Sequence, residues 1–229
     1  MASKPLKPHQ RAIVIAAVLT LVSWFILPLQ LVLLPLQFLN THLHEMAHAI
    51  TAVATGGEAH YIAVYADSSG VTQVSGGSGI LVSMAGYLGA SIAGAALLYF
   101  ARSSSRAKNG LTGLGIVLLF SCLVWVRGDG VGLVTGYGWA ALLLLLGWKL
   151  KGDHALIAIQ IVAMQQCLNS AQSLLTLFGL SAAGHSQNDA GILEAMTGIP
   201  AIAVASLWLV AGLLLLVFTL PKAWHEKPT

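Results

Sequence analysis

The chain has 229 residues, of which 57% are hydrophobic and only 8% are charged, and its mean hydropathy is +0.82. A soluble domain carries about 25% charged residues, so the composition argues against a soluble globular protein. The formal net charge is +3, but no basic patch with interleaved aromatic residues accompanies it, so we expect no nucleic-acid partner. We expect one integral membrane domain over residues 1–229, surrounded by the lipid bilayer.

Apolar stretches divide the chain into candidate membrane segments. The first follows a short polar tail, and we interpret it as a retained span because no convincing signal-peptide cleavage site follows it. Pro28 and Pro35 mark kinks or ends near its C-terminal part. The composition predicts an all-α polytopic membrane protein with six or seven transmembrane helices. The candidate segments are residues 12–34, 36–54, 80–100, 111–126, 131–150, 155–180 and 201–220.

The second of these segments contains an HExxH motif, His44-Glu45-Met46-Ala47-His48. Positions i and i+4 share one face of a helix, so His44 and His48 can bind one zinc ion. Glu45 then lies beside the metal, where it can take a proton from bound water. Ionisable groups inside a membrane are costly, which favours function over a chance match on a structural helix.

The stretch between the motif segment and the next apolar segment, residues 58–79, has a different character. Residues 61–65 and 71–74 are short β-prone runs, and residues 67–70 between them form a turn signal. We predict a β-hairpin-like insertion, with an ordinary interhelical loop as the alternative. The free edge of such a hairpin could hold an extended peptide by strand addition.

Small and amide side chains mark several later segments. Gly86, Ala90 and Gly94 fall four residues apart, which predicts close helix packing. An amide cluster in segment 155–180 is interpreted as interhelical hydrogen-bond partners, with a water path to the metal as the alternative; its members are Gln165, Gln166 and Asn169.

The distribution of basic residues bears on orientation in the membrane. Seven spans would place one group of cations on the N-terminal side, namely Lys4, Lys7, Arg11 and Arg127. The other lysines and arginines would lie on the opposite side, which slightly favours an extracytoplasmic N-terminus by the positive-inside rule.

A catalytic zinc site needs three protein ligands and one open position, and the HExxH motif supplies two. His42 lies two residues before His44, so it faces away from the pair and is not expected to be a ligand. Spacing alone leaves the third ligand open among carboxylates and histidines near segment ends. These candidates are Glu58, His60, Asp67, Asp129, Asp153, His154, His185, Asp189 and Glu194.

Two blocks of the sequence resemble the M50B-like branch of the site-2 protease (M50) family of intramembrane zinc metallopeptidases. The resemblance covers about residues 36–210. The first block comprises His44-Glu45-Met46-Ala47-His48-Ala49, Thr55-Gly56-Gly57, Ser69-Gly70-Val71-Thr72 and Gly76-Gly77. The second comprises Asn188-Asp189-Ala190, Leu193, Thr197-Gly198-Ile199-Pro200 and Trp208.

The resemblance implies that Asp189 is the third zinc ligand. The chain departs from the better-known members, because it has no Leu-Asp-Gly signature and no room for a PDZ-type domain. His185 lies one helical turn before Asp189 and is the alternative ligand. Asp189 could instead serve as the N-cap of the last helix.

The function that we expect is hydrolysis of peptide bonds in membrane-protein or transmembrane-peptide substrates. One Zn²⁺ per chain would activate water, with Glu45 as general base. The alternative is a catalytically silent membrane protein that binds a metal for transport, sensing or assembly. The resemblance also implies a bacterial cytoplasmic (inner) membrane, while the sequence leaves the oligomeric state open.

Overall fold

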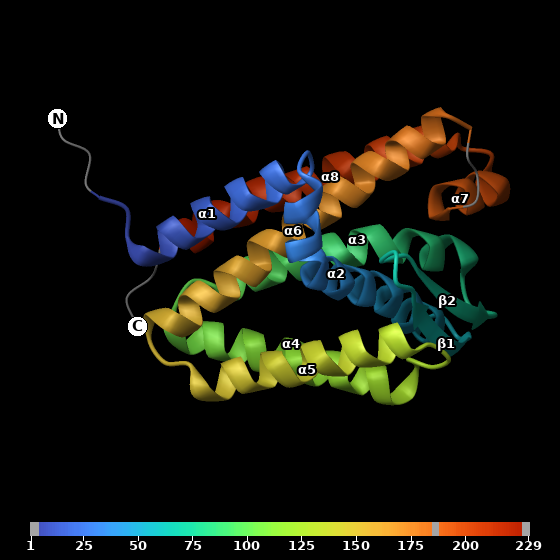
Figure 1. Ribbon diagram of the computed structural model, residues 1–229. Helices are drawn as coiled ribbons and strands as arrows, with labels where there is room; N and C mark the ends of the chain where they lie inside the picture. The colour runs from blue at the N-terminus through green and yellow to red at the C-terminus, as the bar shows by residue number, and fades with distance from the viewer. Residues whose placement is uncertain (1–4, 185–187, 226–229) are drawn as a thin grey trace.

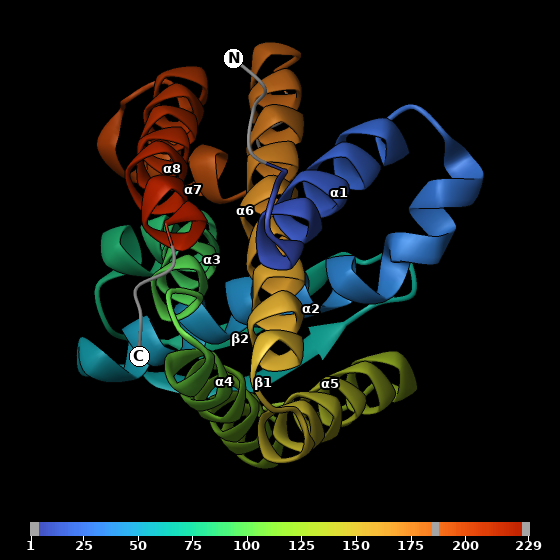
Figure 2. The same ribbon diagram turned by 90° about the vertical axis from the view of Figure 1, so that its left-hand side faces the viewer.

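The computed structural model describes residues 5–184 and 188–225, and these residues form eight helices and one two-stranded sheet (Figure 1). The helices are α1 (Pro8–Ser23), α2 (Leu27–Ala54), α3 (Gly79–Phe100), α4 (Ser104–Val124), α5 (Gly130–Lys149), α6 (Asp153–Ala182), α7 (Asp189–Thr197) and α8 (Ala201–Trp224). Strands β1 (Glu58–Val64) and β2 (Gly70–Ser75) lie between α2 and α3. Figure 2 views the bundle along its length and shows α6 in its centre, between α1, α3 and α8.

Apolar helices of membrane-spanning length make up much of the bundle. In the described part of the chain, α3, α4, α5 and α8 are long and apolar enough to cross a membrane. The pair α1 and α2 could make a fifth span, bent by 118° at its break. The mostly helical membrane architecture is therefore confirmed, whereas six or seven spans remain a prediction. Buried amides lower the hydropathy of α6, which is not among the four.

The first two candidate segments have different bounds in the structure. Segment 12–34 is divided, because α1 ends at Ser23 and α2 begins at Leu27. Pro28 lies in the first turn of α2, where a missing N–H is tolerated. Pro35, by contrast, lies inside α2 without ending it, so the predicted boundary at residue 35 is wrong. Trp139 of α5 donates an indole hydrogen bond to the Pro35 carbonyl at 2.6 Å, which holds this part of the helix.

Two members of the amide cluster of α6, Gln166 and Asn169, make hydrogen bonds between helices. The side-chain amides of Gln166 and Asn169 both donate to the carbonyl of Leu36 in α2, at 3.3 and 3.2 Å. One turn further along α2, the Ser170 hydroxyl donates to Asn40 Oδ1 at 3.0 Å. These contacts favour the interpretation of Gln166 and Asn169 as interhelical partners, and they fix α2 against the central helix.

The predicted β-hairpin is confirmed, and the interhelical loop is not formed. β1 and β2 are antiparallel, with Glu58 opposite Ser75 and Val64 opposite Gly70. The outer edge of β1 is occupied at Ile62, whose N–H donates to Trp125 O at 2.8 Å and whose carbonyl accepts from Arg127 N at 3.0 Å. Within the described residues β2 pairs with β1 alone, so its outer edge is open.

Glycines allow the hairpin to start directly beside the end of α2. A methyl group built at Gly57 would lie 2.7 Å from the backbone of Gly76, so the chain can pass itself here only without a side chain. Gly56, with φ of +84°, ends the helix in a conformation that glycine adopts readily. Both glycine pairs of the first motif block thus set the hairpin against the HExxH helix.

Candidate metal centre

The HExxH motif occupies the C-terminal half of α2, where the helix is enclosed by the bundle. Leu39, Leu43 and Ala49 on this part of the helix are fully or almost fully buried in the core. The polar residues Glu45 and His48 are buried as well, and they are only 5% and 6% exposed. Packing around α2 therefore holds the motif side chains in a protected position.

Asp189 reaches the motif because a short helix begins there. Asn188 has an extended backbone and its side chain accepts a hydrogen bond from Gly191 N at 3.0 Å, so Asn188 is the N-cap of α7. Asp189 is the first helical residue, and the N-cap interpretation of Asp189 is therefore wrong. Leu193, Ala190 and Trp208 belong to a small core that fastens α7 to α6 and α8.

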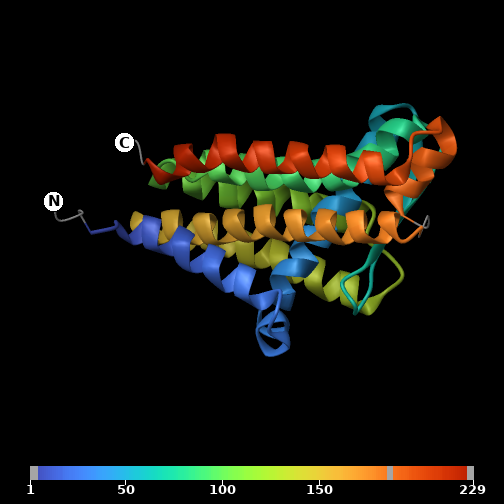
Figure 3. The ribbon, with the colours of Figure 1, turned by 90° about the horizontal axis from the view of Figure 1, so that it is seen from above.

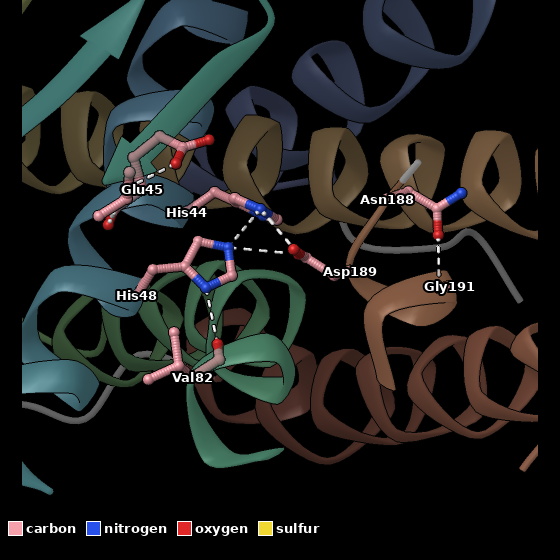
Figure 4. A network of polar contacts seen from close by, with 8 residues as sticks. His44, Glu45, His48, Val82, Asn188, Asp189 and Gly191 are labelled. Atoms are coloured by element: carbon pink, nitrogen blue, oxygen red, sulfur yellow. Dashed lines mark hydrogen bonds and ion pairs between the residues drawn. The ribbon is translucent and has the colours of Figure 1, made fainter. Parts of the chain in front are cut away.

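Three ligand-type atoms converge between α2 and α7 (Figure 4). His44 Nε2 and His48 Nε2 lie 3.0 Å apart, and Asp189 Oδ2 lies 3.2 Å from each of them. Two ligands bound to a tetrahedral zinc at about 2.0 Å are about 3.3 Å apart. The three atoms therefore have the spacing of one face of a zinc coordination shell, with the fourth position left for a substrate or water.

The hydrogen bonding of His48 indicates which of its ring atoms could hold a metal. Its Nδ1 lies 2.7 Å from the carbonyl of Val82 in α3, so Nδ1 carries the proton that is donated there. A neutral imidazole then presents a lone pair from Nε2 toward Asp189 Oδ2, which also accepts. Nε2 and Oδ2 face each other at 3.2 Å and can share one cation, either a proton on Nε2 or a divalent metal in its place.

The charge state of Asp189 suits a metal ligand. Burial alone raises the pKa of a carboxyl group, but the hydrogen bonds and charges of His44 and His48 outweigh it and bring the pKa of Asp189 below its usual range. Its Oδ2 is buried and has no hydrogen-bond donor, among the described residues, beyond these two rings. An ionised carboxylate oxygen in this setting could coordinate a metal ion.

The other candidates for the third ligand lie elsewhere or outside the described residues. Glu58 and His60 lie 3.8 Å from each other on the exposed side of β1. Asp67 lies at the hairpin turn, where hydrogen bonds from the Ser69 hydroxyl and N–H hold its pKa below the usual range. The remaining described candidates are absent from the metal-binding group; they are Asp129, Asp153, His154 and Glu194. His185 lies outside the described residues.

His42 faces away from the three ligand-type atoms, as expected. Its Nε2 lies 3.0 Å from the Thr135 hydroxyl of α5. Two residues on a helix differ by about 200° in direction, so His42 and His44 point to opposite sides of α2.

Gly86 of α3 lies directly against the pair of histidines, which spacing alone did not indicate. A methyl group built at Gly86 would lie 2.4 Å from Nε2 of both His44 and His48. Gly86 is one of the regularly spaced small residues, and helix packing was the only role that its spacing suggested. The structure adds that the missing side chain leaves the space in which a metal would sit.

An aromatic wall lies behind His44, and sequence reasoning also missed it. The Tyr87 ring meets the His44 ring edge to face at 4.6 Å between centroids, and Tyr87 stacks on the buried Trp208 at 5.7 Å. Trp208 belongs to the second motif block, and its contact with Tyr87 explains how a residue of α8 supports a ligand on α2. The wall limits the orientations that His44 can adopt.

Glu45 is held by the hairpin rather than by the ligand cluster. The Thr72 hydroxyl of β2 lies 2.7 Å from Glu45 Oε2 and 2.9 Å from the Glu45 carbonyl oxygen. Gly70 of the same strand packs so closely on Glu45 that a methyl group there would lie 2.7 Å from Oε1. The hairpin therefore sets the direction of the carboxylate beside the metal site.

A cleft of about 620 Å³ opens onto these residues. His44, Glu45, His48 and Asp189 line it together with residues of β2, α3 and α7. Val71 of β2 and Ile192 and Met196 of α7 supply apolar surface to this lining. A peptide segment can thus approach the ligand cluster from outside the bundle.

A comparison with protein families matches the Peptidase M50B-like model over residues 12–219. The chain belongs to the Peptidase M50B-like family. Neither the curated proteins nor the solved structures gave a match.

Membership in the Peptidase M50B-like family confirms the resemblance seen in the sequence. The family and the apolar helices together indicate an integral membrane protein, and they suggest an intramembrane metallopeptidase of the site-2 type. Peptidases of the M50 family are generally zinc-dependent. The match covers both α2 and α7, which supply the convergent histidines and aspartate.

Proposed function

We propose that the chain is an intramembrane zinc metalloprotease that hydrolyses peptide bonds of membrane-protein substrates. The observation that carries the proposal is the convergence of His44 Nε2, His48 Nε2 and Asp189 Oδ2 in the cleft beside Glu45. One zinc ion per chain would be held by these three residues. Zinc, when bound there, activates water and polarises the scissile carbonyl.

Each residue of the motif has a separate task in the proposed reaction. The Glu45 carboxylate accepts a proton from the attacking water and later delivers it to the leaving amine nitrogen. The Thr72 hydroxyl, 2.7 Å from Oε2, keeps that carboxylate in one orientation. The Val82 carbonyl keeps the His48 ring in the tautomer whose Nε2 faces the metal position.

The open edge of β2 supports a mode of substrate binding. A substrate segment in extended form would add to β2 as a third strand, because the outer edge of β1 already binds Trp125 and Arg127. Gly70, Val71 and Thr72 of β2 line the cleft, so an added strand would pass the ligand cluster. The substrate must be unwound there, since helical peptide bonds are shielded by their own hydrogen bonds.

The zinc content of purified protein tests the proposed ligand set. We expect about one zinc per chain in the wild type and a loss of at least about tenfold in affinity for Asp189→Ala, since one of three protein ligands is removed. Metal analysis after dialysis against a weak chelator measures this loss. Glu194→Ala is the matched control, because Glu194 lies on the same helix but outside the ligand group. Full zinc in Asp189→Ala would remove Asp189 from the proposed site.

A catalytically silent metal-binding protein is the second candidate function. Glu45 argues against it, because a transport or structural site needs ligands but no general base.

Replacing Thr72 tests the positioning of Glu45. A hydrogen bond to a charged group contributes about 1.5–3 kcal/mol, so Thr72→Val should lower kcat by about tenfold or more. KM and zinc content should change little, because Val keeps the shape of the strand. Thr72→Ser should restore most of kcat, and a serine variant as slow as the valine variant would contradict the role of the hydroxyl.

A further inference from the structure

The ionised residues are separated between the two ends of the helix bundle. One end, called here the basic end, is where α1, α4 and α6 begin and α3, α5 and α8 finish (Figure 3). Hydrogen bonds hold it together: Gln160 donates to the carbonyls of Ala101 and Ala223, and Gln10 donates to Trp224 O. The other end, called the metal end, carries the hairpin, α7 and the turn between α4 and α5 (Figure 1).

The basic end collects nearly all of the described cations. Of the nine lysines and arginines among residues 5–184 and 188–225, eight lie in the helix ends and turns of the basic end. Among the seven described aspartates and glutamates, Asp153 alone lies at that end. The eight cations are Lys7, Arg11, Arg102, Arg106, Lys108, Lys149, Lys151 and Lys222.

Lys7 and Arg11 share this end with the cations of the later turns, which changes the orientation predicted from the sequence. Seven straight spans would have put the N-terminal cations opposite the cluster at residues 102–108. The bend of 118° between α1 and α2 makes the pair run from the basic end to the metal end only once. Both described ends of the chain therefore lie on one side (Figure 1).

Arg127, the ninth cation, lies at the metal end and folds back over the end of α4. Its guanidinium donates to four backbone carbonyls at the end of α4, including Leu123 O at 2.6 Å and Val126 O at 2.8 Å. Its charge thus stabilises the C-terminus of α4. The metal end is otherwise acidic, with Glu58, Asp67 and Glu194 beside the cleft residues.

Exposed aromatic rings at the basic end are paired with its cations. Lys149 Nζ lies 3.7 Å from the centre of the Trp148 ring, which is 70% exposed. Arg102 lies 4.9 Å from the centre of the exposed Tyr99 ring, and Arg106 lies 5.9 Å from it. Tryptophan and tyrosine rings are enriched at the level of lipid headgroups, where their apolar faces meet the acyl chains. These pairs mark the basic end as a membrane interface.

We propose that the basic end docks on the anionic headgroups of the cytoplasmic leaflet and that the metal end faces the extracytoplasmic side. Cytoplasmic loops carry an excess of lysine and arginine, and anionic lipids of that leaflet attract such clusters. Together with the proposed proteolytic function, on which this step rests, the orientation defines a substrate class. The substrates are membrane proteins whose unwound segment enters the cleft from the extracytoplasmic side.

Labelling of single cysteines in a bacterial inner membrane tests the orientation. Ala66→Cys places a thiol at the exposed hairpin turn, and Ser105→Cys places one among the cations at the start of α4. In spheroplasts, a membrane-impermeant maleimide should label Ala66→Cys at least about tenfold faster than Ser105→Cys. After permeabilisation both should react. The wild type is the blank, because Cys122 and Cys167 are buried.

Every other labelling pattern overturns the proposal. Faster labelling of Ser105→Cys would mean the inverse orientation, and equal labelling from one side would mean that the ends do not face opposite sides. In a second experiment each cysteine variant also carries glutamine at the cations of both turns, and each cysteine should then be labelled from both sides. These glutamine substitutions are at Arg102, Arg106, Lys108, Lys149 and Lys151. An unchanged labelling pattern would contradict the proposed contact with anionic lipid headgroups. Labelling needs no catalysis, so an inactive but correctly oriented protein would refute only the proteolytic function.

Discussion

Substitution of Glu45 with glutamine should abolish peptide cleavage while zinc stays bound. Glutamine has the size of glutamate and its carbonyl oxygen can still accept the Thr72 hydrogen bond at Oε, so α2 and the hairpin should keep their contact. It cannot accept a proton from water at neutral pH. General-base catalysis contributes about 10²- to 10⁴-fold to the rate, so we expect kcat to fall by at least about 10²-fold.

Cleavage of a transmembrane peptide in reconstituted vesicles, measured together with zinc per chain, checks this result. Glu58→Gln is the matched control, because Glu58 is an exposed carboxylate of the nearby hairpin and lies outside the ligand group. Cleavage by Glu45→Gln at the wild-type rate would reject the general-base role. Loss of zinc in the same variant would mean that Glu45 acts on the metal site itself rather than on the proton.

The separation of these two readouts follows from where the residues lie. His44 and His48 point toward Asp189, whereas the Glu45 carboxylate lies on the hairpin side of α2 (Figure 4). In the proposed reaction, metal binding and proton transfer would therefore be carried by different side chains of one helix. Substitution of a ligand and substitution of Glu45 can thus be distinguished by zinc content.

Features of the fold that depend on local spacing could be predicted from the sequence. The pairing of His44 with His48 follows from helical periodicity, and the hairpin follows from two β-prone runs around a turn signal. Helix ends were less predictable. Residues 104–110 form the start of α4 although they are polar, because polar residues such as Arg106 and Lys108 are good helix formers. Pro35 lies within α2, because packing in the bundle outweighs its low helix propensity.

Contacts between distant elements could not be predicted from the residues alone. No spacing rule brings Asp189 to α2, and its choice over the other carboxylates came from the family resemblance. Thr72 and Gly86 have common structural explanations in a sequence, a β-branched strand residue and a packing glycine. Their contacts with Glu45 and with the two histidines arise only once the hairpin and α3 fold against α2.

A single added methyl group at Gly86 should empty the metal site. Built on the backbone, it would lie 2.4 Å from Nε2 of His44 and of His48, close to the distance of about 2.0 Å at which zinc binds imidazole nitrogen. The methyl group would compete with the metal for the same space. We expect Gly86→Ala to weaken zinc binding by at least about 10²-fold and cleavage to fall with it.

Two further glycine variants separate loss of the site from displaced helices. Gly89→Ala creates a similar clash between α3 and α2, 2.4 Å from Ala47 Cβ, but away from the histidine rings. Gly113→Ala on α4 meets nothing within 4 Å and controls for helix propensity. If Gly89→Ala lost as much zinc as Gly86→Ala, the cause would be movement of α2. Zinc lost in Gly86→Ala alone, with thermal unfolding of all three variants close to that of the wild type, would show that a glycine on α3 keeps the metal position open.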